Sequence, residues 1–160
     1  MILKNLSVIC LILSQAVVEN ICNASENSLG IGAGAPYTGI GINYGFINNA
    51  DLKYISFGCM SIGSSSNNAI ESNCGFGAGW MRSDIITTKN DNHGIGLHVS
   101  ATYNTHDNRD DIELFYGVTY GYYFKGMDSQ GWSIGFSPSI INDDKGSHSS
   151  LWVNLGYQYD

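Results

Sequence analysis

Two groups of serine and histidine residues in this sequence have the types and spacing that nucleophilic catalysis needs. His98 and Ser100 lie two residues apart, and so do His148 and Ser150, which follow closely after Asp144. A serine becomes a nucleophile when a nearby histidine takes its proton and a carboxylate orients that histidine. If the protein is an enzyme, the candidate catalytic residues are therefore His148, Ser150 and Asp144. Serine and histidine are also ordinary polar residues of a sheet, so we expect no catalytic site.

The cysteines allow two interpretations. Cys59 and Cys74 flank a segment rich in serine and asparagine and could pair across a hairpin. Exported proteins form disulfides, but connectivity does not follow from spacing, and Cys22 would be left over. A disulfide between Cys59 and Cys74 and a set of free thiols therefore both remain open.

An acidic segment supplies oxygen atoms but fails as a metal-binding motif. Asp107, Asn108, Asp110 and Asp111 are suitable Ca²⁺ ligands, but Ile112 stands where a calcium-binding loop needs glycine. We predict no metal and no cofactor. The net charge of −7 also leaves no basic patch to neutralise phosphates, which argues against a nucleic-acid partner.

The chain divides into three expected segments. Residues 1–16 have the layout of a secretory signal peptide: Lys4, then an apolar run, then the small-x-small triplet that ends at Ala16. Residues 17–27 are polar and lack periodicity, which predicts a flexible leader. Residues 28–160 show a steady pattern that predicts one domain, since a chain of 160 residues seldom holds more.

Alternation of apolar with small or polar residues is the dominant signal in that domain. In 111–123 one side carries Ile112, Leu114, Tyr116, Val118, Tyr120 and Tyr122, and the other carries mostly glycine, threonine and glutamate. Side chains of a strand alternate between its two faces. The same pattern predicts eight strands, at 28–35, 37–47, 52–62, 74–85, 93–104, 111–123, 131–141 and 151–159. The segment 52–62 is apolar on both faces, which indicates a bulge or a half-buried edge.

The composition decides which face points outward. Only 13% of the residues are charged, against roughly 25% in ordinary soluble domains. The second face carries glycine, serine, threonine and asparagine, which suit a narrow barrel interior better than a solvated surface. Charges gather in the expected turns, and Tyr and Trp lie mostly near strand ends, as in an aromatic girdle. We therefore predict an all-β fold: an eight-stranded antiparallel up-and-down transmembrane β-barrel.

The signal peptide, the eight short alternating strands and the last strand with its terminal aromatics resemble the small outer-membrane proteins of Gram-negative bacteria, of the OmpX, OmpW and OmpA-barrel kind. The likeness covers Ser28 to Asp160. Two features depart from it: the chain ends Tyr159-Asp160 rather than on an aromatic residue, and few charges face inward. The resemblance implies the outer membrane as location and its lipid as partner.

The expected function is a structural or surface-interaction role without enzymatic activity. The segments 35–38, 63–73, 105–111 and 142–150 are expected to be the outside loops, which could contact an extracellular ligand or a host surface. Three alternatives remain: a secreted soluble β-barrel that binds a small ligand, a lipid-modifying barrel enzyme, and a porin-like passive pore. Eight-stranded barrels are usually filled by their own side chains, which argues against the pore.

Overall fold

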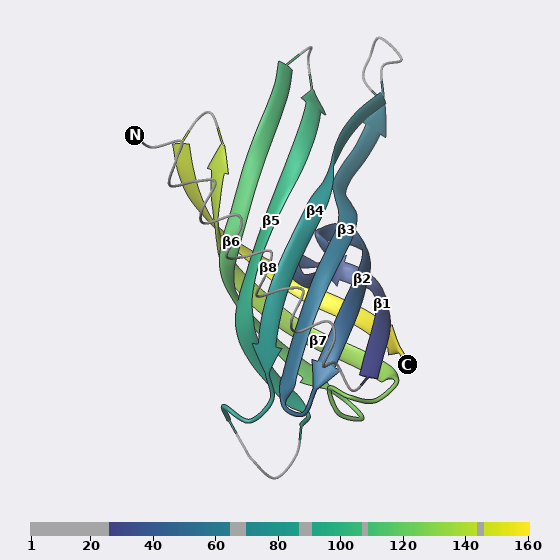
Figure 1. Cartoon of the computed structure of the whole chain (residues 1–160). Coiled ribbons are helices and arrows are strands. Elements are labelled where there is room, and N and C mark those ends of the chain that lie inside the picture. Colours follow the sequence, from purple (N-terminus) through teal and green to yellow (C-terminus); the bar gives the residue numbers. More distant parts are fainter. Residues whose placement is uncertain (1–25, 65–69, 87–90, 107–108, 144–145) are drawn as a thin grey trace, which may run out of the picture.

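The computed structural model describes residues 26–64, 70–86, 91–106, 109–143 and 146–160. Its strands form one closed antiparallel barrel in which neighbours in sequence pair and β8 returns to β1 (Figure 1). The elements are β1 (Glu26–Gly34), the 3₁₀ turn η1 (Ala35–Tyr37), β2 (Gly39–Asn48), β3 (Asp51–Ser64), β4 (Ile70–Arg82), β5 (His93–His106), β6 (Arg109–Tyr123), β7 (Gly131–Asp143) and β8 (Gly146–Tyr159). The predicted eight-stranded up-and-down barrel is confirmed. Within the described ranges, no helix is long and apolar enough to cross a membrane.

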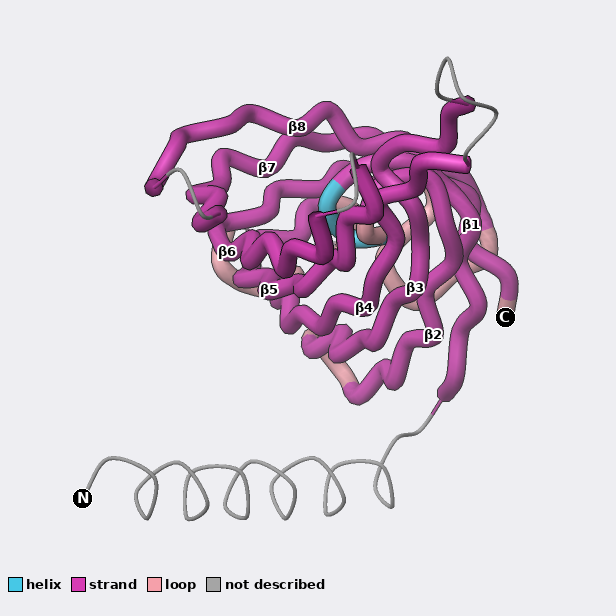
Figure 2. The backbone as a smooth tube through the Cα atoms, turned by 90° about the horizontal axis from the view of Figure 1, so that it is seen from above, coloured by secondary structure: helices cyan, strands magenta, loops and turns pink. Residues whose placement is uncertain are grey.

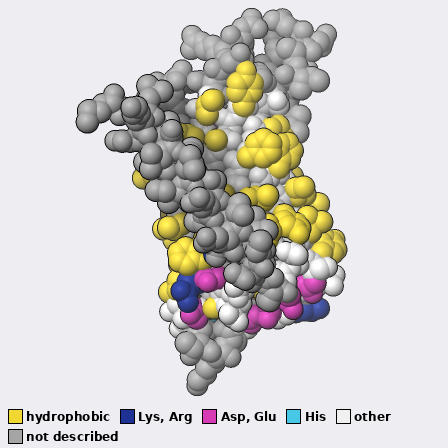
Figure 3. Space-filling model, in the orientation of Figure 1, with side chains coloured by type: hydrophobic (Ala, Val, Ile, Leu, Met, Phe, Trp, Pro, Cys, Tyr) yellow, Lys and Arg dark blue, Asp and Glu magenta, His cyan; other side chains and the backbone are white. Residues whose placement is uncertain are grey.

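The two faces of the wall follow the predicted alternation. Every strand exposes large apolar side chains, which form a belt around the barrel. Figure 3 shows the part of this belt that lies on one face. The belt includes Leu29, Ile31, Ile42, Ile55, Phe57, Phe76, Leu97, Val99, Leu114, Val118, Ile134, Phe136, Val153 and Leu155. Many of the buried residues are polar: Ser28, Ser56, His98, Ser100, Thr102, Thr119, Ser137, Ser139, Asn154 and Gln158. The barrel therefore inverts the usual arrangement of a soluble protein, with apolar groups outside and polar groups inside.

Several strands are longer than the sequence pattern predicted. β4 begins at Ile70, β6 at Arg109 and β8 at Gly146, so parts of three expected loops are strands. β1 begins at Glu26, which pairs with Ile47, so the predicted leader 17–27 reaches too far. The reason is that ladder hydrogen bonds join backbone groups, and polar residues can extend a strand without showing apolar alternation. The expected signal peptide and Cys22 lie outside the described residues.

We name the two ends of the barrel by their connections. The turn end holds the β2–β3, β4–β5 and β6–β7 connections, and the loop end holds the β3–β4, β5–β6 and β7–β8 connections. At the loop end, β3 to β8 extend beyond β1 and β2, which stop about halfway up the wall (Figure 1). Charged side chains gather at the turn end in the face that Figure 3 shows.

β3 contains the bulge that its irregular pattern suggested, but its apolar part is not an edge, because residues 51–59 pair with both β2 and β4. Leu52 and Tyr54 are buried inside the barrel, while Ile55 and Phe57 are exposed on the outside, so both of its faces are apolar in this part. The register with β4 shifts between Cys59 and Ser61, which marks a bulge. Cys59 and Cys74 are cross-strand neighbours joined by a disulfide with an S–S distance of 2.08 Å.

Candidate functional site: the plugged barrel interior

The connection between β1 and β2 turns into the barrel instead of outward. Pro36, Tyr37 and Thr38 are buried, and Figure 2 shows η1 inside the ring of strands. Gly34 has a φ of 114° and Thr38 a φ of 55°, and these two positive values turn the chain inward and back. Gly34 also has no space for a side chain, because a Cβ would lie 2.8 Å from the Cα of Asn154. We call residues 35–38 the plug. The expectation that they form an outside loop is wrong.

Hydrogen bonds to the surrounding strands hold the plug in place. The backbone N–H of Ala35 donates to Oδ1 of Asn154 at 3.1 Å, and Nδ2 of Asn43 donates to the carbonyl oxygen of Pro36 at 3.3 Å. The hydroxyls of Thr38 and Ser56 lie 2.7 Å apart. These bonds satisfy polar groups that the inward turn removes from solvent, which would otherwise destabilise it.

The ring of Tyr37 occupies space that glycines leave free. A Cβ on Gly32 would lie 2.7 Å from the Tyr37 ring, and a Cβ on Gly156 would overlap the Tyr37 hydroxyl group. Both glycines face inward on β1 and β8, where they are register partners. The glycine-rich inner face therefore has a packing role: it makes room for the plug.

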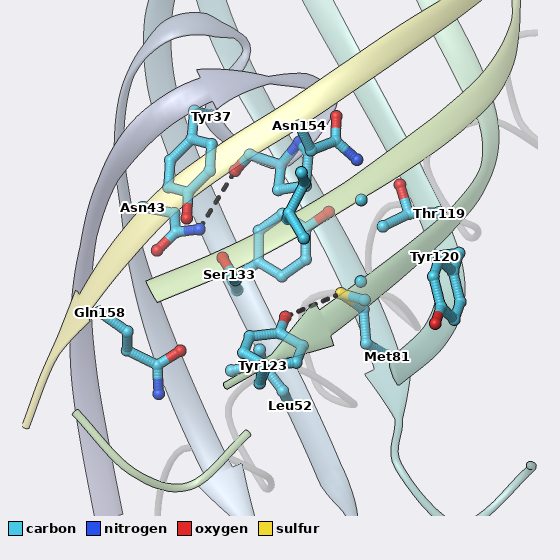
Figure 4. A pocket seen from close by; sticks show the side chains of 15 residues that line it. Tyr37, Asn43, Leu52, Met81, Thr119, Tyr120, Tyr123, Ser133, Asn154 and Gln158 are labelled. Atoms are coloured by element: carbon cyan, nitrogen blue, oxygen red, sulfur yellow. Dashed lines mark hydrogen bonds between the residues drawn. The ribbon is translucent and has the colours of Figure 1, made fainter. Parts of the chain in front are cut away.

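Below the plug, apolar side chains fill the turn end. Ile47, Leu52, Tyr54, Met81, Tyr123 and Met127 form one buried cluster. Tyr123 donates from its hydroxyl to the sulfur of Met81 at 3.4 Å. The cavity between this cluster and the plug measures about 20 Å³ (Figure 4), which is room for about one water molecule. A ligand of any larger size has no space there.

A polar layer centred on His98 lies behind the plug. Nδ1 of His98 is 3.1 Å from Oγ1 of Thr119, and Nε2 is 3.0 Å from Oγ of Ser139. The hydroxyl of Thr119 lies 2.5 Å from that of Ser137, which accepts a 2.8 Å hydrogen bond from Nδ2 of Asn154. Since Asn154 also accepts from the plug, a continuous chain of hydrogen bonds connects the plug to His98.

This geometry gives His98 a structural role. His98 and Ser100 face inward together, as the alternation predicts, but the hydroxyls that His98 contacts belong to Thr119 and Ser139. Catalysis by a serine–histidine pair needs a carboxylate on the second ring nitrogen, and here a hydroxyl takes that position. His98 is also only 4% exposed, so a substrate cannot reach it.

The other candidate residues lie at the loop end. His148 and Ser150 are in β8, in what was expected to be a loop, and they pair with Ile141 and Ser139 of β7. His148 is exposed and Ser150 is half-buried. Asp144 lies outside the described residues.

The carboxylate of Glu113 faces into the barrel near the loop end. Its Oε2 accepts from Nδ2 of Asn73 at 2.8 Å and its Oε1 accepts from Nδ2 of Asn104 at 3.3 Å. The two amides thus hold the carboxylate between β4, β5 and β6. His148, His98 and the other residues of the described ranges form no group of three metal-ligating side chains.

Sequence reasoning missed the plug and the role of Asn154. The sequence shows Gly34, Pro36 and Gly39 close together, which indicates a turn but not its direction.

Comparisons with known protein families, with curated proteins and with solved structures found no match.

Proposed function

We propose that this chain is a small outer-membrane β-barrel of a Gram-negative bacterium, with a closed interior and a structural or surface-interaction role. The observation that carries the proposal is the exposed apolar belt, to which all eight strands contribute. In water such a belt is unfavourable by roughly 25 cal/mol for each Å² of apolar surface. In a bilayer the same surface contacts acyl chains, and a closed barrel satisfies its backbone groups internally.

The filled interior supports a non-conducting barrel. The plug and the cluster beneath it occupy the cross-section at the level of β1 and β2. The same filling disfavours the secreted ligand-binding alternative at this level of the barrel, because the cavity beneath the plug, of about 20 Å³, is too small for a ligand. Of the two serine–histidine groups, the one at His98 and Ser100 does not support the enzyme alternative, since His98 is enclosed and bonded to the hydroxyls of Thr119 and Ser139.

Heat-modifiability tests the proposal directly. The chain is expressed with residues 1–16, outer membranes are isolated, and boiled and unboiled samples are compared on SDS gels. We expect the unboiled protein to migrate differently from the boiled one and to resist carbonate extraction, because the intact barrel withstands detergent. A protein that is recovered free in the periplasm or medium, with a single mobility, would overturn the membrane location.

A further inference from the structure

Four inward side chains near the loop end carry oxygen atoms and lie on three neighbouring strands: Asn73 of β4, Thr102 and Asn104 of β5, and Glu113 of β6. Asn73 is the register partner of Asn104, and Thr102 is the register partner of Glu113. Opposed side chains on one face of an antiparallel pair have Cβ atoms about 5 Å apart. The four side chains therefore form one compact set, which we call the Glu113 group.

Two oxygen atoms of the Glu113 group are buried without a hydrogen bond. In the described part of the chain, neither Oδ1 of Asn73 nor Oγ1 of Thr102 has a hydrogen-bond partner. The two residues are only 7% and 1% exposed. Buried polar atoms are nearly always paired in folded proteins, because an unpaired atom loses its bonds to water and gains nothing in return. Two such oxygens beside one carboxylate indicate a site for a ligand that binds oxygen lone pairs.

The two asparagines direct their N–H groups, and not their oxygens, at the carboxylate. Nδ2 of Asn73 donates to Oε2 of Glu113 at 2.8 Å, and Nδ2 of Asn104 donates to Oε1 at 3.3 Å. These N–H groups lie where a cation would lie beside the carboxylate. Turning an asparagine amide by 180° about its Cβ–Cγ bond exchanges its nitrogen and its oxygen. After this turn, the carboxylate and both amide oxygens point to a common centre.

The chemistry of the Glu113 group selects a small, hard cation. Its ligand atoms are carboxylate, amide and hydroxyl oxygens, which Ca²⁺ and Mg²⁺ prefer over nitrogen and sulfur ligands. The unpartnered oxygens of Asn73 and Thr102 are closed to solvent, so a water molecule or an ammonium group of similar size does not reach them. A bare Ca²⁺ ion needs less room, because it binds oxygen at about 2.3–2.6 Å. Mg²⁺ keeps several of its waters and demands octahedral geometry, so it fits less well.

We propose that the Glu113 group binds one Ca²⁺ ion inside the loop end of the barrel. Glu113 supplies the negative charge, and Asn73, Asn104 and Thr102 supply neutral oxygens. Ca²⁺ takes about six to eight oxygen ligands, so water or the oxygens of a second molecule completes the shell. These reach the ion from the side of Glu113, which is half-buried and so remains accessible. The ion joins β4, β5 and β6 at the end of the barrel that lacks an apolar core cluster among the described residues.

A site with one carboxylate binds Ca²⁺ weakly, and we expect a Kd of about 0.1–1 mM, as in extracellular calcium modules. Glu113 is the only acidic member, so the group differs from sets of three His, Cys, Asp or Glu side chains, of which the described ranges hold none. The sequence-based expectation of no metal came from one loop motif, whereas this group is assembled from three strands. The inference goes beyond the proposed function, because the site lies inside the barrel and does not depend on the membrane.

Titration with CaCl₂, followed by NMR, tests the proposal on the full chain folded in detergent micelles. The readouts are the side-chain amide signals of Asn73 and Asn104 and the carboxyl ¹³C signal of Glu113, with choline chloride holding the ionic strength constant. We expect these signals to shift together and to reach half-saturation at about 0.1–1 mM Ca²⁺. MgCl₂ should need a concentration at least about tenfold higher. NaCl at the same ionic strength should give no saturable shift.

Three variants sharpen the titration. Glu113→Gln removes the charge at constant size and should weaken Ca²⁺ binding by at least about tenfold. Glu26→Gln makes the same change in an exposed side chain at the start of β1 and should bind like the wild type. Asn73→Asp adds a second carboxylate, so it should bind Ca²⁺ more tightly, and CaCl₂ should raise its urea midpoint. A purely structural role of Asn73 predicts no such effect of Ca²⁺, so this variant decides the outcome if Glu113→Gln does not fold.

Three results would overturn the proposal: no saturable shift up to about 20 mM CaCl₂, well above the expected Kd; equal half-saturation for the wild type and Glu113→Gln; or an equal response to NaCl and CaCl₂, which reports screening alone. Carbonate extraction of membranes that contain the same chain reports separately on the proposed function. A chain that binds Ca²⁺ but is released by carbonate would overturn the membrane location and support the calcium site.

Discussion

The turn end and the loop end of this barrel differ in both wall and interior. At the turn end all eight strands are paired, and an apolar cluster around Met81 and Tyr123 fills the interior. At the loop end the wall consists of β3 to β8, and the interior is mostly polar, with Glu113 held by two asparagines. From this difference we expect the turn end to supply most of the stability of the barrel.

Truncating one large side chain at each end compares the two regions most directly. Tyr123 is buried and bonded to Met81, so Tyr123→Ala should lower the free energy of unfolding by about 3–5 kcal/mol. Trp152 is half-buried at the loop end and packs edge-on against Phe115 at 6.3 Å, so Trp152→Ala should cost only about 1–2 kcal/mol. Urea unfolding in detergent micelles measures both. Equal losses would contradict the contrast between the ends.

The plug marks the border between the two regions, and its tyrosine has a matched control. Tyr37→Ala should lower the free energy of unfolding by about 3 kcal/mol, because it leaves a cavity against Gly32 and Gly156. Tyr44 lies on the outer face and is 40% exposed, so Tyr44→Ala should cost about 1 kcal/mol or less. The same urea titration decides the outcome. A smaller loss for Tyr37 than for Tyr44 would mean that the plug does not hold the barrel together.

Removing the disulfide tests whether the loop end depends on a covalent restraint. Cys59 and Cys74 are 15 residues apart, and closing a loop of that length is worth about 3 kcal/mol at most. Replacing both cysteines by alanine should lower stability by up to that amount. Amide exchange should become faster in β3 and β4 near the disulfide and stay unchanged at the turn end, for example at Lys53 and Trp80. Uniformly faster exchange would show that the two ends unfold as one unit.

Two carboxyl groups at the turn end should give small pH effects of opposite sign. Partial burial and the nearby Asp128 raise the pKa of Asp91. The folded chain then holds this proton more tightly than the unfolded chain, so stability falls as the pH rises from the ordinary pKa of Asp through the raised one. Asp91→Asn should remove this fall and so stabilise the protein more at pH 7 than at pH 3.

Asp84 is the matched case. Hydrogen bonds from Arg82, at 2.9 and 2.6 Å, lower the pKa of Asp84. The stability that ionised Asp84 adds to the folded protein is therefore present above the ordinary pKa of Asp and is lost as the pH falls through the lowered pKa. Asp84→Asn should destabilise the protein slightly at pH 7 and have no effect in strong acid. Urea midpoints at the two pH values measure both variants, and equal signs would contradict the assignment.

Alternation in the sequence was enough to predict the strands and their faces. Ile112, Leu114, Tyr116 and Val118 point outward and Phe115 inward, as the pattern of β6 predicts. Strand boundaries at the loop end could not be predicted as well, because residues such as Ser147 and Ser149 pair through their backbones and leave no apolar signal. The candidate residues His98 and Ser100 were placed on the correct face, but the hydrogen-bond partners of His98 come from β6 and β7, which alternation does not reveal.

By itself the sequence determined the number of strands, the apolar outside and the small or polar inside, because side-chain direction in a strand depends only on position along the chain. The tertiary structure alone decided that the plug turns inward, that Asn154 connects it to His98, and that β3 and β8 extend beyond their pairing with β2 and β1. These features depend on space and hydrogen-bond partners from strands distant in sequence. Tyr37 lies more than a hundred residues before Gly156 in the sequence. Gly156 leaves space for its ring only because β8 pairs with β1.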